Sequence, residues 1–263
     1  LGLVGNVSLP DGTVVDGTNA AKVLMHDVYW NYPVEESDGI FASVASAAFD
    51  KILSGIGDVD VAKLVSAVER GAEEGRLIAW MRNDDEQNAI KETGIDASLP
   101  DPDDPSADPV AGVYFNNLSF SKLDWYLNAD TQIGQGVKNG DGTCSYRITV
   151  TLTNIMTQEE AGKLPDYVAA SAPDAARDDE RLNVSLFAPT GGNITDLTVE
   201  GTQFGLGAAT WHGIPFYSGT VDLHAGETTT ITYTLTTSAE AGDKPLTLRQ
   251  TPTCQAARDS ASA

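Results

Sequence analysis

Apolar residues in the first third of the chain recur every three or four positions, the period of an amphipathic helix. This spacing predicts a helix over Asn19–Trp30, which Pro33 ends. A second helix is predicted to begin at a Ser37 N-cap and to stop at Gly55. A third is predicted over Val59–Glu74, so the N-terminal part is helical.

The next segment alternates between strand-like and helix-like patterns. Leu77–Met81 is a short apolar run that predicts a strand, and Asp84–Thr93 has the acidic first turn that favours a helix. Asp101–Pro109 is rich in Asp and Pro, which indicates an exposed loop or linker. The alternation of strand and helix suggests that this region is the remnant of an α/β domain.

Beyond residue 109 the period changes to that of β-strands. In Tyr146–Thr153 and Thr229–Leu235, apolar and polar residues alternate, as in half-buried antiparallel strands. Asn139–Gly142 predicts a hairpin turn. Strands are predicted at Val110–Phe115, Asp124–Val137, Ser145–Asn154, Leu182–Phe187, Ile194–Val199, Thr220–Leu223, Thr228–Thr236 and Leu246–Gln250.

These elements together predict an α+β fold. About seven short strands separated by turns are typical of an immunoglobulin-like antiparallel β-sandwich. We expect a helix-rich segment over residues 1–109, truncated at its N-terminus, a β-sandwich over residues 110–255, and a tail over residues 256–263.

The charge of the chain limits its partners. Its 263 residues include 16 Lys and Arg against 38 Asp and Glu, which gives a net charge of −22. Such a surface repels phosphate backbones and anionic lipid headgroups, so we exclude nucleic acid as a partner. No run reaches the roughly 20 apolar residues of a membrane helix, and no signal peptide opens the sequence. We therefore expect a soluble piece of a longer chain.

Cys144 and Cys254 are the only cysteines, and their spacing is not that of a zinc site. An even, sparse pair favours a disulfide, with two buried thiols as the alternative. A bond between them would close a loop of about 110 residues, which chain-entropy models credit with on the order of 4 to 5 kcal/mol. Such a bond would persist outside the cytoplasm.

The common catalytic and nucleotide-binding motifs are absent from the sequence, and we expect no cofactor and no metal. His26 lies beside Asp27 in a predicted helix, where neighbouring residues are expected to point in different directions. For an enzyme, the least implausible polar groups are Asp27, Asp38 and Arg76, which would have to converge in one pocket.

Polar and aromatic residues crowd the border between the helical and β-rich parts. Clefts at such borders are favoured ligand sites, although close packing between the two parts explains the same pattern. The candidate ligand-binding residues at this border are Asn116, Asn117, Lys122, Trp125 and Tyr126.

Several segments resemble actinobacterial membrane-anchored envelope proteins of domain-of-unknown-function family 4012. The resemblance covers nearly the whole chain and is carried by Leu9–Gly12, Asn19–Leu24, Asp27–Tyr29, Phe41–Phe49, Glu74–Leu77, Tyr114–Asn116, Lys122–Leu127 and Leu164–Val168. It implies an extracytoplasmic location at the cell surface, with an anchor through an upstream transmembrane helix. The N-terminal part is also similar to the LytR-CpsA-Psr phosphotransferases. Asn31–Asp50 contains no arginine that could hold a pyrophosphate, so no catalytic residue is carried over.

The sequence thus favours a non-enzymatic cell-envelope domain that binds or scaffolds a wall glycopolymer or another surface protein. The alternative is a glycopolymer transferase or hydrolase that acts on the cell wall. A third hypothesis, a calcium-stabilised adhesin, depends on the Asp-rich segment 101–108, where alternating prolines make a poor ligand cage.

Overall fold

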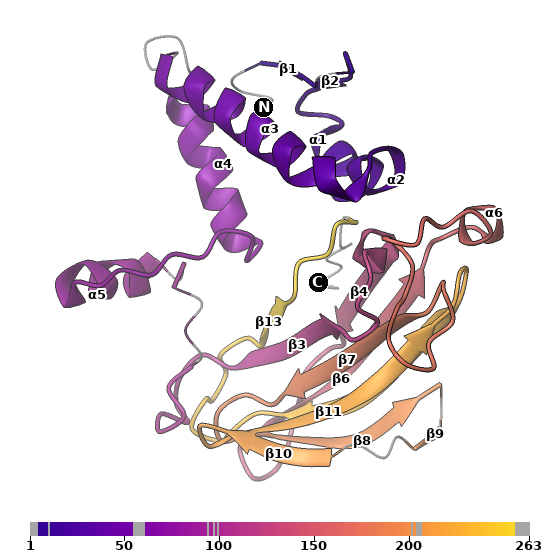
Figure 1. Cartoon of the computed structure of the whole chain (residues 1–263). Coiled ribbons are helices and arrows are strands. Elements are labelled where there is room, and N and C mark those ends of the chain that lie inside the picture. The colour runs from indigo at the N-terminus through magenta and orange to yellow at the C-terminus, as the bar shows by residue number, and fades with distance from the viewer. Residues whose placement is uncertain are drawn as a thin grey trace.

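The computed structural model describes residues 5–9, 11–54, 61–93, 95–96, 98, 100–200, 202–203 and 207–255. Helices form the N-terminal part and two β-sheets the C-terminal part, so the fold is α+β as predicted (Figure 1). No helix in these ranges has both the length and the apolar character that crossing a lipid bilayer demands. Gly55 and the predicted tail lie outside the described residues.

The N-terminal part combines a small hairpin with helices. A core of valines with Leu9 and Ile40 joins the hairpin to the first helices, with Val15 and Val28 completely buried. The elements are β1 (Val7–Ser8), β2 (Val14–Val15), α1 (Ala20–Lys22), the π-helical turn η1 (Val23–Asp27), α2 (Val28–Asn31), α3 (Val34–Ser54), α4 (Val61–Glu73) and α5 (Asp84–Thr93).

Two N-terminal predictions were wrong in detail. Ser37 does not cap a helix: it is buried inside α3, which begins at Val34. Pro33 precedes that start, where its fixed φ suits a helix and its missing N–H is not needed. Leu77–Met81 is extended but belongs to no sheet in the described ranges, and Ala79 alone makes a strand-like bond, to Ile95.

The C-terminal part contains two sheets. One has the order β10-β11-β7-β3-β13, and the other has the order β4-β6-β12-β8-β9, with β5 beside β6. Among these pairs only β3 with β13 is parallel. The elements are β3 (Val110–Asn117), the 3-10 turn η2 (Leu123–Tyr126), β4 (Leu127–Ile133), β5 (Val137–Lys138), β6 (Cys144–Asn154), α6 (Gln158–Ala161), β7 (Glu180–Phe187), β8 (Asn193–Val199), β9 (Thr202–Gln203), β10 (Gly207–Trp211), β11 (Ile214–Leu223), β12 (Thr228–Thr236) and β13 (Thr247–Gln250).

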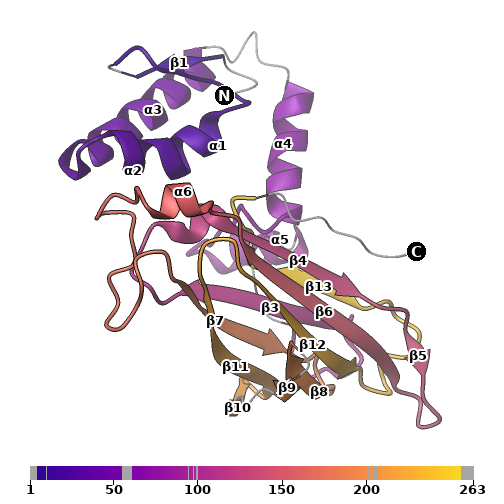
Figure 2. The same ribbon diagram turned by 90° about the vertical axis from the view of Figure 1, so that its right-hand side faces the viewer.

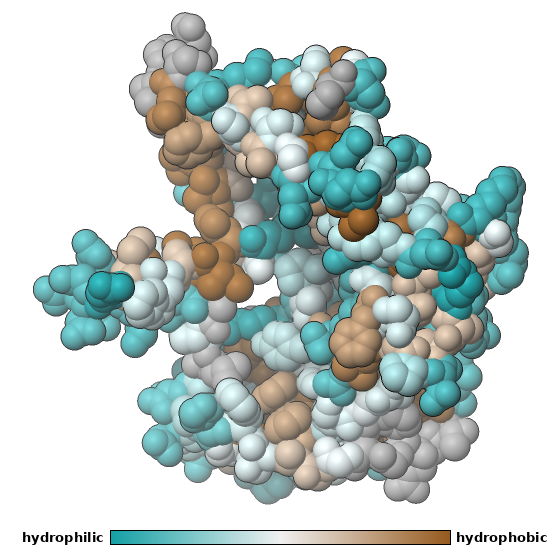
Figure 3. All heavy atoms as spheres, viewed as in Figure 1, coloured by the Kyte–Doolittle hydropathy of each residue, from teal (hydrophilic) through white to brown (hydrophobic). Residues whose placement is uncertain are grey.

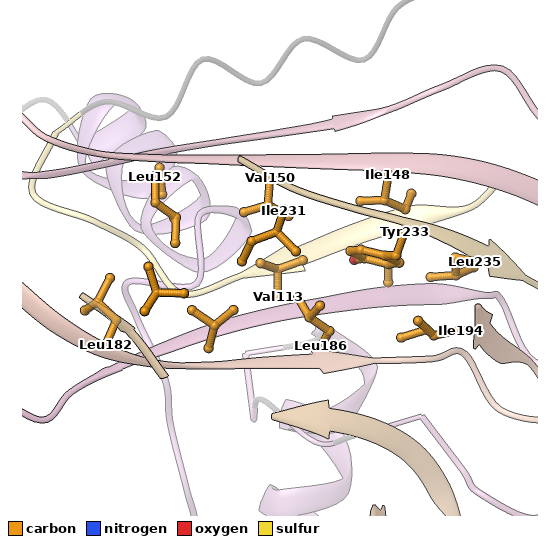
Figure 4. Close-up of a cluster of buried hydrophobic side chains, with 14 of the residues drawn as sticks. Val113, Ile148, Val150, Leu152, Leu182, Leu186, Ile194, Ile231, Tyr233 and Leu235 are labelled. Atoms are coloured by element: carbon orange, nitrogen blue, oxygen red, sulfur yellow. The ribbon is translucent and has the colours of Figure 1, made fainter. Parts of the chain in front are cut away.

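The two sheets pack face to face around one apolar core. Val113 and Leu186 of the five-stranded sheet face Val150 and Ile231 of the six-stranded sheet (Figure 4). The alternation predicted for β6 and β12 is confirmed, because their inward residues are buried and their outward threonines are not. Helices α1 to α3 lie across the end of this sandwich that carries α6 (Figure 2).

The predicted disulfide is wrong, because Cys144 and Cys254 are both free thiols. Cys144 begins β6, which then runs roughly 34 Å to Asn154 at about 3.4 Å per residue. Cys254 lies at the far end of the sandwich, where its neighbour Gln255 donates a hydrogen bond to the carbonyl of Trp125. Since bonded cysteines need Cα atoms within about 7 Å, the pair cannot bond in this fold.

Candidate functional site

A row of aligned residues crosses the outer face of the five-stranded sheet. Phe216 in β11 pairs with Phe187 in β7, Phe187 pairs with Gly112 in β3, and Gly112 pairs with Arg249 in β13. Strand β7 buries residues 180, 182, 184 and 186. Because side chains alternate between the two faces of a strand, Phe187 and its row point away from the core.

Aromatic rings cover the middle of this row. The rings of Phe187 and Phe216 stack with centroids 4.7 Å apart, and Tyr114 meets Phe187 edge-on at 5.6 Å. A Cβ placed on Gly112 would lie 2.8 Å from Cε2 of Tyr114, so the tyrosine ring occupies the space above the glycine. A ring that lies on a glycine leaves its opposite face turned away from the sheet.

Polar groups lie beside the rings on the same face. Ser218 Oγ donates to Asn183 Oδ1 at 2.7 Å and is 3.1 Å from Ser185 Oγ. Asn116 pairs with Asn183 across the strands and is exposed. Its side-chain amide has no hydrogen-bond partner among the described residues, so both its donor and its acceptor are free.

Arg249 borders a small hollow at the end of the row. Its Nη1 donates to the carbonyl of Ser98 at 2.6 Å, which holds the guanidinium in place. Burial raises the pKa of Tyr114, and the nearby charge of Arg249 opposes that rise, so the phenol stays protonated at neutral pH. The hollow is lined by Pro100, Val110, Gly112, Tyr114, Phe187, Ala188, Ile214 and Arg249.

We call this surface the sheet face. An aromatic ring face, a free amide and fixed N–H donors are the groups that commonly hold a sugar ring. Nowhere in the described ranges do three His, Cys, Asp or Glu side chains gather as metal ligands. The sheet face comprises Gly112, Tyr114, Asn116, Asn183, Ser185, Phe187, Phe216, Ser218 and Arg249.

A second polar cluster joins the helices to the sandwich, at what we call the junction. His26 Nδ1 is 2.7 Å from Asp27 Oδ1, and His26 Nε2 is 2.8 Å from the Tyr126 hydroxyl. The prediction that His26 and Asp27 point apart was therefore wrong. Both lie in the π-helical turn η1, whose wider spacing changes the directions of its side chains.

The His26 chain of hydrogen bonds runs from the buried Tyr126 outward to Asp27 and the exposed Lys22. Burial tends to raise the pKa of Asp27, but hydrogen bonds from Lys22 and His26 outweigh it and leave that pKa below its usual value. An ionised Asp27 accepts a hydrogen bond from His26 Nδ1, while His26 Nε2 contacts the Tyr126 hydroxyl. Burial raises the pKa of Tyr126, and Trp30 stacks on the imidazole at 5.3 Å. Because Tyr126 is buried, this chain of hydrogen bonds connects two parts of the fold.

Lys122 and Phe120 lie on the loop that leads into η2. Lys122 Nζ is 5.6 Å from the ring centroid of Tyr29 and 5.8 Å from that of Tyr167, so it connects the helices to the sandwich by cation–π contacts. Phe120 is 75% exposed at a φ of 52°, and its carbonyl accepts from Ser171 Oγ. The loop therefore presents one aromatic ring to solvent.

Glu180 is a buried acid at the same end of the sandwich. It is fully buried at the inward-facing start of β7, and neither carboxyl oxygen has a partner among the described residues. Burial raises its pKa well above the usual value, and the charges of Asp124 and Asp179 add to that rise. Asp124 itself is exposed and accepts from Asn117 Nδ2 at 3.0 Å. Burial thus favours the protonated, uncharged form of the Glu180 carboxyl, which is sealed from solvent.

The structure distributes the predicted site residues over two places. Asn116 lies on the sheet face, whereas Asn117, Lys122, Trp125, Tyr126 and Asp27 lie at the junction. Burial is the main cause of the raised pKa of Tyr29, and the nearby charge of Asp38 adds to it. Arg76 pairs with Glu74 and donates to the carbonyl of Thr253. No hydrogen bond or ion pair between described residues joins Asp27, Asp38 and Arg76.

Sequence reasoning did not identify Tyr114, Phe187 and Phe216 as site residues. A usable signal was present for Phe187, since the inward alternation of Leu182 to Leu186 leaves it on the outer face. Which residues of other strands stand beside it depends on the register, and the register is a property of the folded sheet.

The comparisons with known proteins add little. No family model matches the chain, and no curated protein matches it. One similar solved structure is that of a Legionella pneumophila protein described as a candidate nutrient-binding protein. Identity is 11%, the TM-score is 0.28, and the match covers 50% of this chain and 45% of that one. A score this low carries no functional argument, and the resemblance to family 4012 stays a prediction.

Proposed function

We propose that the chain is a non-enzymatic binding module of the bacterial cell envelope and that its sheet face holds an uncharged sugar unit of a wall glycopolymer. One observation carries the proposal: the Tyr114 ring lies over Gly112, beside the free amide of Asn116. The Asn116 amide has no partner in the described fold, and the Tyr114 ring uses one face to pack on Gly112, so the amide and the opposite ring face remain for a ligand.

The surroundings of Tyr114 favour a saccharide. A pyranose ring presents C–H groups to an aromatic face and hydroxyls at its rim. Asn116 can donate and accept at that rim, and Arg249 supplies donors that its bond to Ser98 already orients. The net charge of −22 repels polyanions, which favours a neutral glycan over a teichoic-type polymer.

The location and the type of sandwich belong to the same proposal. The resemblance to family 4012 supports a module at the cell surface, held by an upstream transmembrane helix. The two packed, mainly antiparallel sheets support an immunoglobulin-like relationship. Transferase or hydrolase activity is the weaker alternative, since no hydrogen bond or ion pair joins Asp27, Asp38 and Arg76 in the described part of the chain.

Co-sedimentation with protein-free actinobacterial cell walls tests the proposal. We expect the purified chain to be retained and a soluble arabinogalactan fraction to release it. Asn116→Ala and Tyr114→Ala should each weaken retention by about tenfold. Phe120→Ala is the matched control, because it removes an exposed aromatic ring that lies off the sheet face.

Two results would overturn this function. One is equal retention of wild type, Asn116→Ala and Tyr114→Ala, provided that circular dichroism shows all three folded. The other is release by a teichoic-type polymer and not by arabinogalactan, which would mean that the ligand is an anionic polymer and not an uncharged sugar unit.

A further inference from the structure

The segment Leu77–Met81 between α4 and α5 belongs to no sheet of the described residues, and part of its backbone is unpaired. In an extended chain, the backbone groups of successive residues point to opposite edges, so those of alternate residues share one edge. The inner side is used: the amides of Ala79 and Met81 donate to the Ile95 carbonyl and to the Gln87 side chain. The amide of Leu77, like that of Arg76, caps α4 at the Gly71 carbonyl. The backbone groups of Ile78 and Trp80 form no hydrogen bond with any described residue.

The side chains of Ile78 and Trp80 are also exposed to solvent. Ile78 is 62% exposed and Trp80 is 73% exposed, and both project from the same face of the extended chain. Val65 and Val68 of α4 are exposed as well, and apolar residues follow the length of that helix (Figure 3). None of the three core clusters found among the described residues includes a residue of α4 or of the segment after it. An apolar strand edge of this kind is a template for another strand.

The flanking charges argue against a second copy of this chain as that strand. Antiparallel pairing of two copies about Ala79 would place Arg76 of one opposite Arg82 of the other. It would also bring Glu74 against Asp84, and like charges directly opposite each other are destabilising. Arg76 is already paired with Glu74, so the surplus charge around the edge is negative. Exposed acids flank the edge at Glu73, Glu74, Asp84, Asp85 and Glu86.

We propose that Leu77–Met81 is the docking edge for an extended strand of a partner protein. This strand would have alternating apolar residues and lysine or arginine at both ends. Its backbone would satisfy Ile78 and Trp80, its apolar side chains would cover their side chains, and its basic ends would face the acidic flanks. This protein contact is separate from the glycan site on the sheet face.

The test uses a synthetic peptide of alternating valine and threonine with paired lysines at both ends. Binding to the full chain should slow hydrogen exchange at the amides of Ile78 and Trp80 and shift Trp80 fluorescence to shorter wavelength. Trp80→Phe assigns that shift among the four tryptophans. Ile78→Pro removes a donor from the open edge only, and it should weaken binding at least about tenfold.

Altered peptides can be tested on the wild-type chain, so this part of the test does not depend on whether the protein variants fold. A peptide N-methylated at alternate residues should not bind, and one with glutamates in place of lysines should bind at least about tenfold more weakly. Equal binding of either peptide to the wild-type chain would overturn the proposal. Concentration-dependent self-association that Ile78→Pro abolishes would also overturn it, because the occupant would then be a second copy.

Discussion

Tyr233 is the largest completely buried side chain of the core, and its hydroxyl has no partner among the described residues. Burial without a partner costs about 1–3 kcal/mol, because the hydroxyl leaves water and gains nothing in return. Tyr233→Phe removes that cost with almost no change in shape. We expect the free energy of unfolding in urea to rise by about 1 kcal/mol, whereas Tyr167→Phe at the surface should leave it unchanged. A lower stability of Tyr233→Phe would reveal a partner for the hydroxyl.

Glu180 makes stability depend on pH in the direction opposite to that of an ion-paired acid. Its pKa is raised in the folded state, so the folded chain holds this proton more tightly than the unfolded chain. The stability that protonated Glu180 contributes is therefore fully present below the unfolded pKa of about 4.3. It is lost as the pH rises through the folded pKa. Glu180→Gln should raise the unfolding free energy at pH about 7, and this advantage should shrink toward pH about 4. A constant difference across urea titrations at both pH values would contradict this assignment.

At the scale of an element, the π-helical turn η1 connects the helices to the sandwich through His26. His26→Ala removes the bonds to Asp27 and Tyr126, one of them to a charged group, and we expect the unfolding free energy to fall by about 2 kcal/mol. Hydrogen exchange at the Trp30 indole should accelerate, while strands β6 and β12 stay protected. Met25→Ala, an exposed change in the same turn, is the control. Equal acceleration in the sandwich would mean that His26 supports the whole fold.

Elements that bury one face were predictable, and elements defined by their partners were not. Periodicity located β6, β12 and α5 because each carries its own pattern of apolar or acidic residues. It could not show that η1 is a π-helix, since one extra residue in a turn leaves the apolar spacing almost unchanged. Strand β10 was missed because all its residues are exposed, so no alternation marks it.

At the scale of the molecule, the α+β class could be predicted, whereas the positions of distant segments could not. Helical and strand periods occupy separate parts of the sequence, which is enough to predict the class. The sheet face depends on β11, β7, β3 and β13 standing side by side in one register, and no local pattern contains that order. Asn116 was proposed as a ligand-binding residue for its border position, yet its neighbours on the sheet face come from strands far away in sequence.

The two cysteines give a prediction at this largest scale. The length of β6 separates Cys144 from Cys254, and the junction and the core would both have to break for them to meet. The purified chain, denatured without reductant, should therefore react with two equivalents of iodoacetamide, and its melting temperature should not change when a reductant is added. A bond would instead make melting reductant-sensitive, since a loop of about 110 residues contributes on the order of 4 to 5 kcal/mol. Cys144→Ser separates the two cases, because it lowers stability by that amount only if the thiols are bonded. One free thiol and one blocked thiol would point to a disulfide with another molecule, which this fold permits at either end of the sandwich.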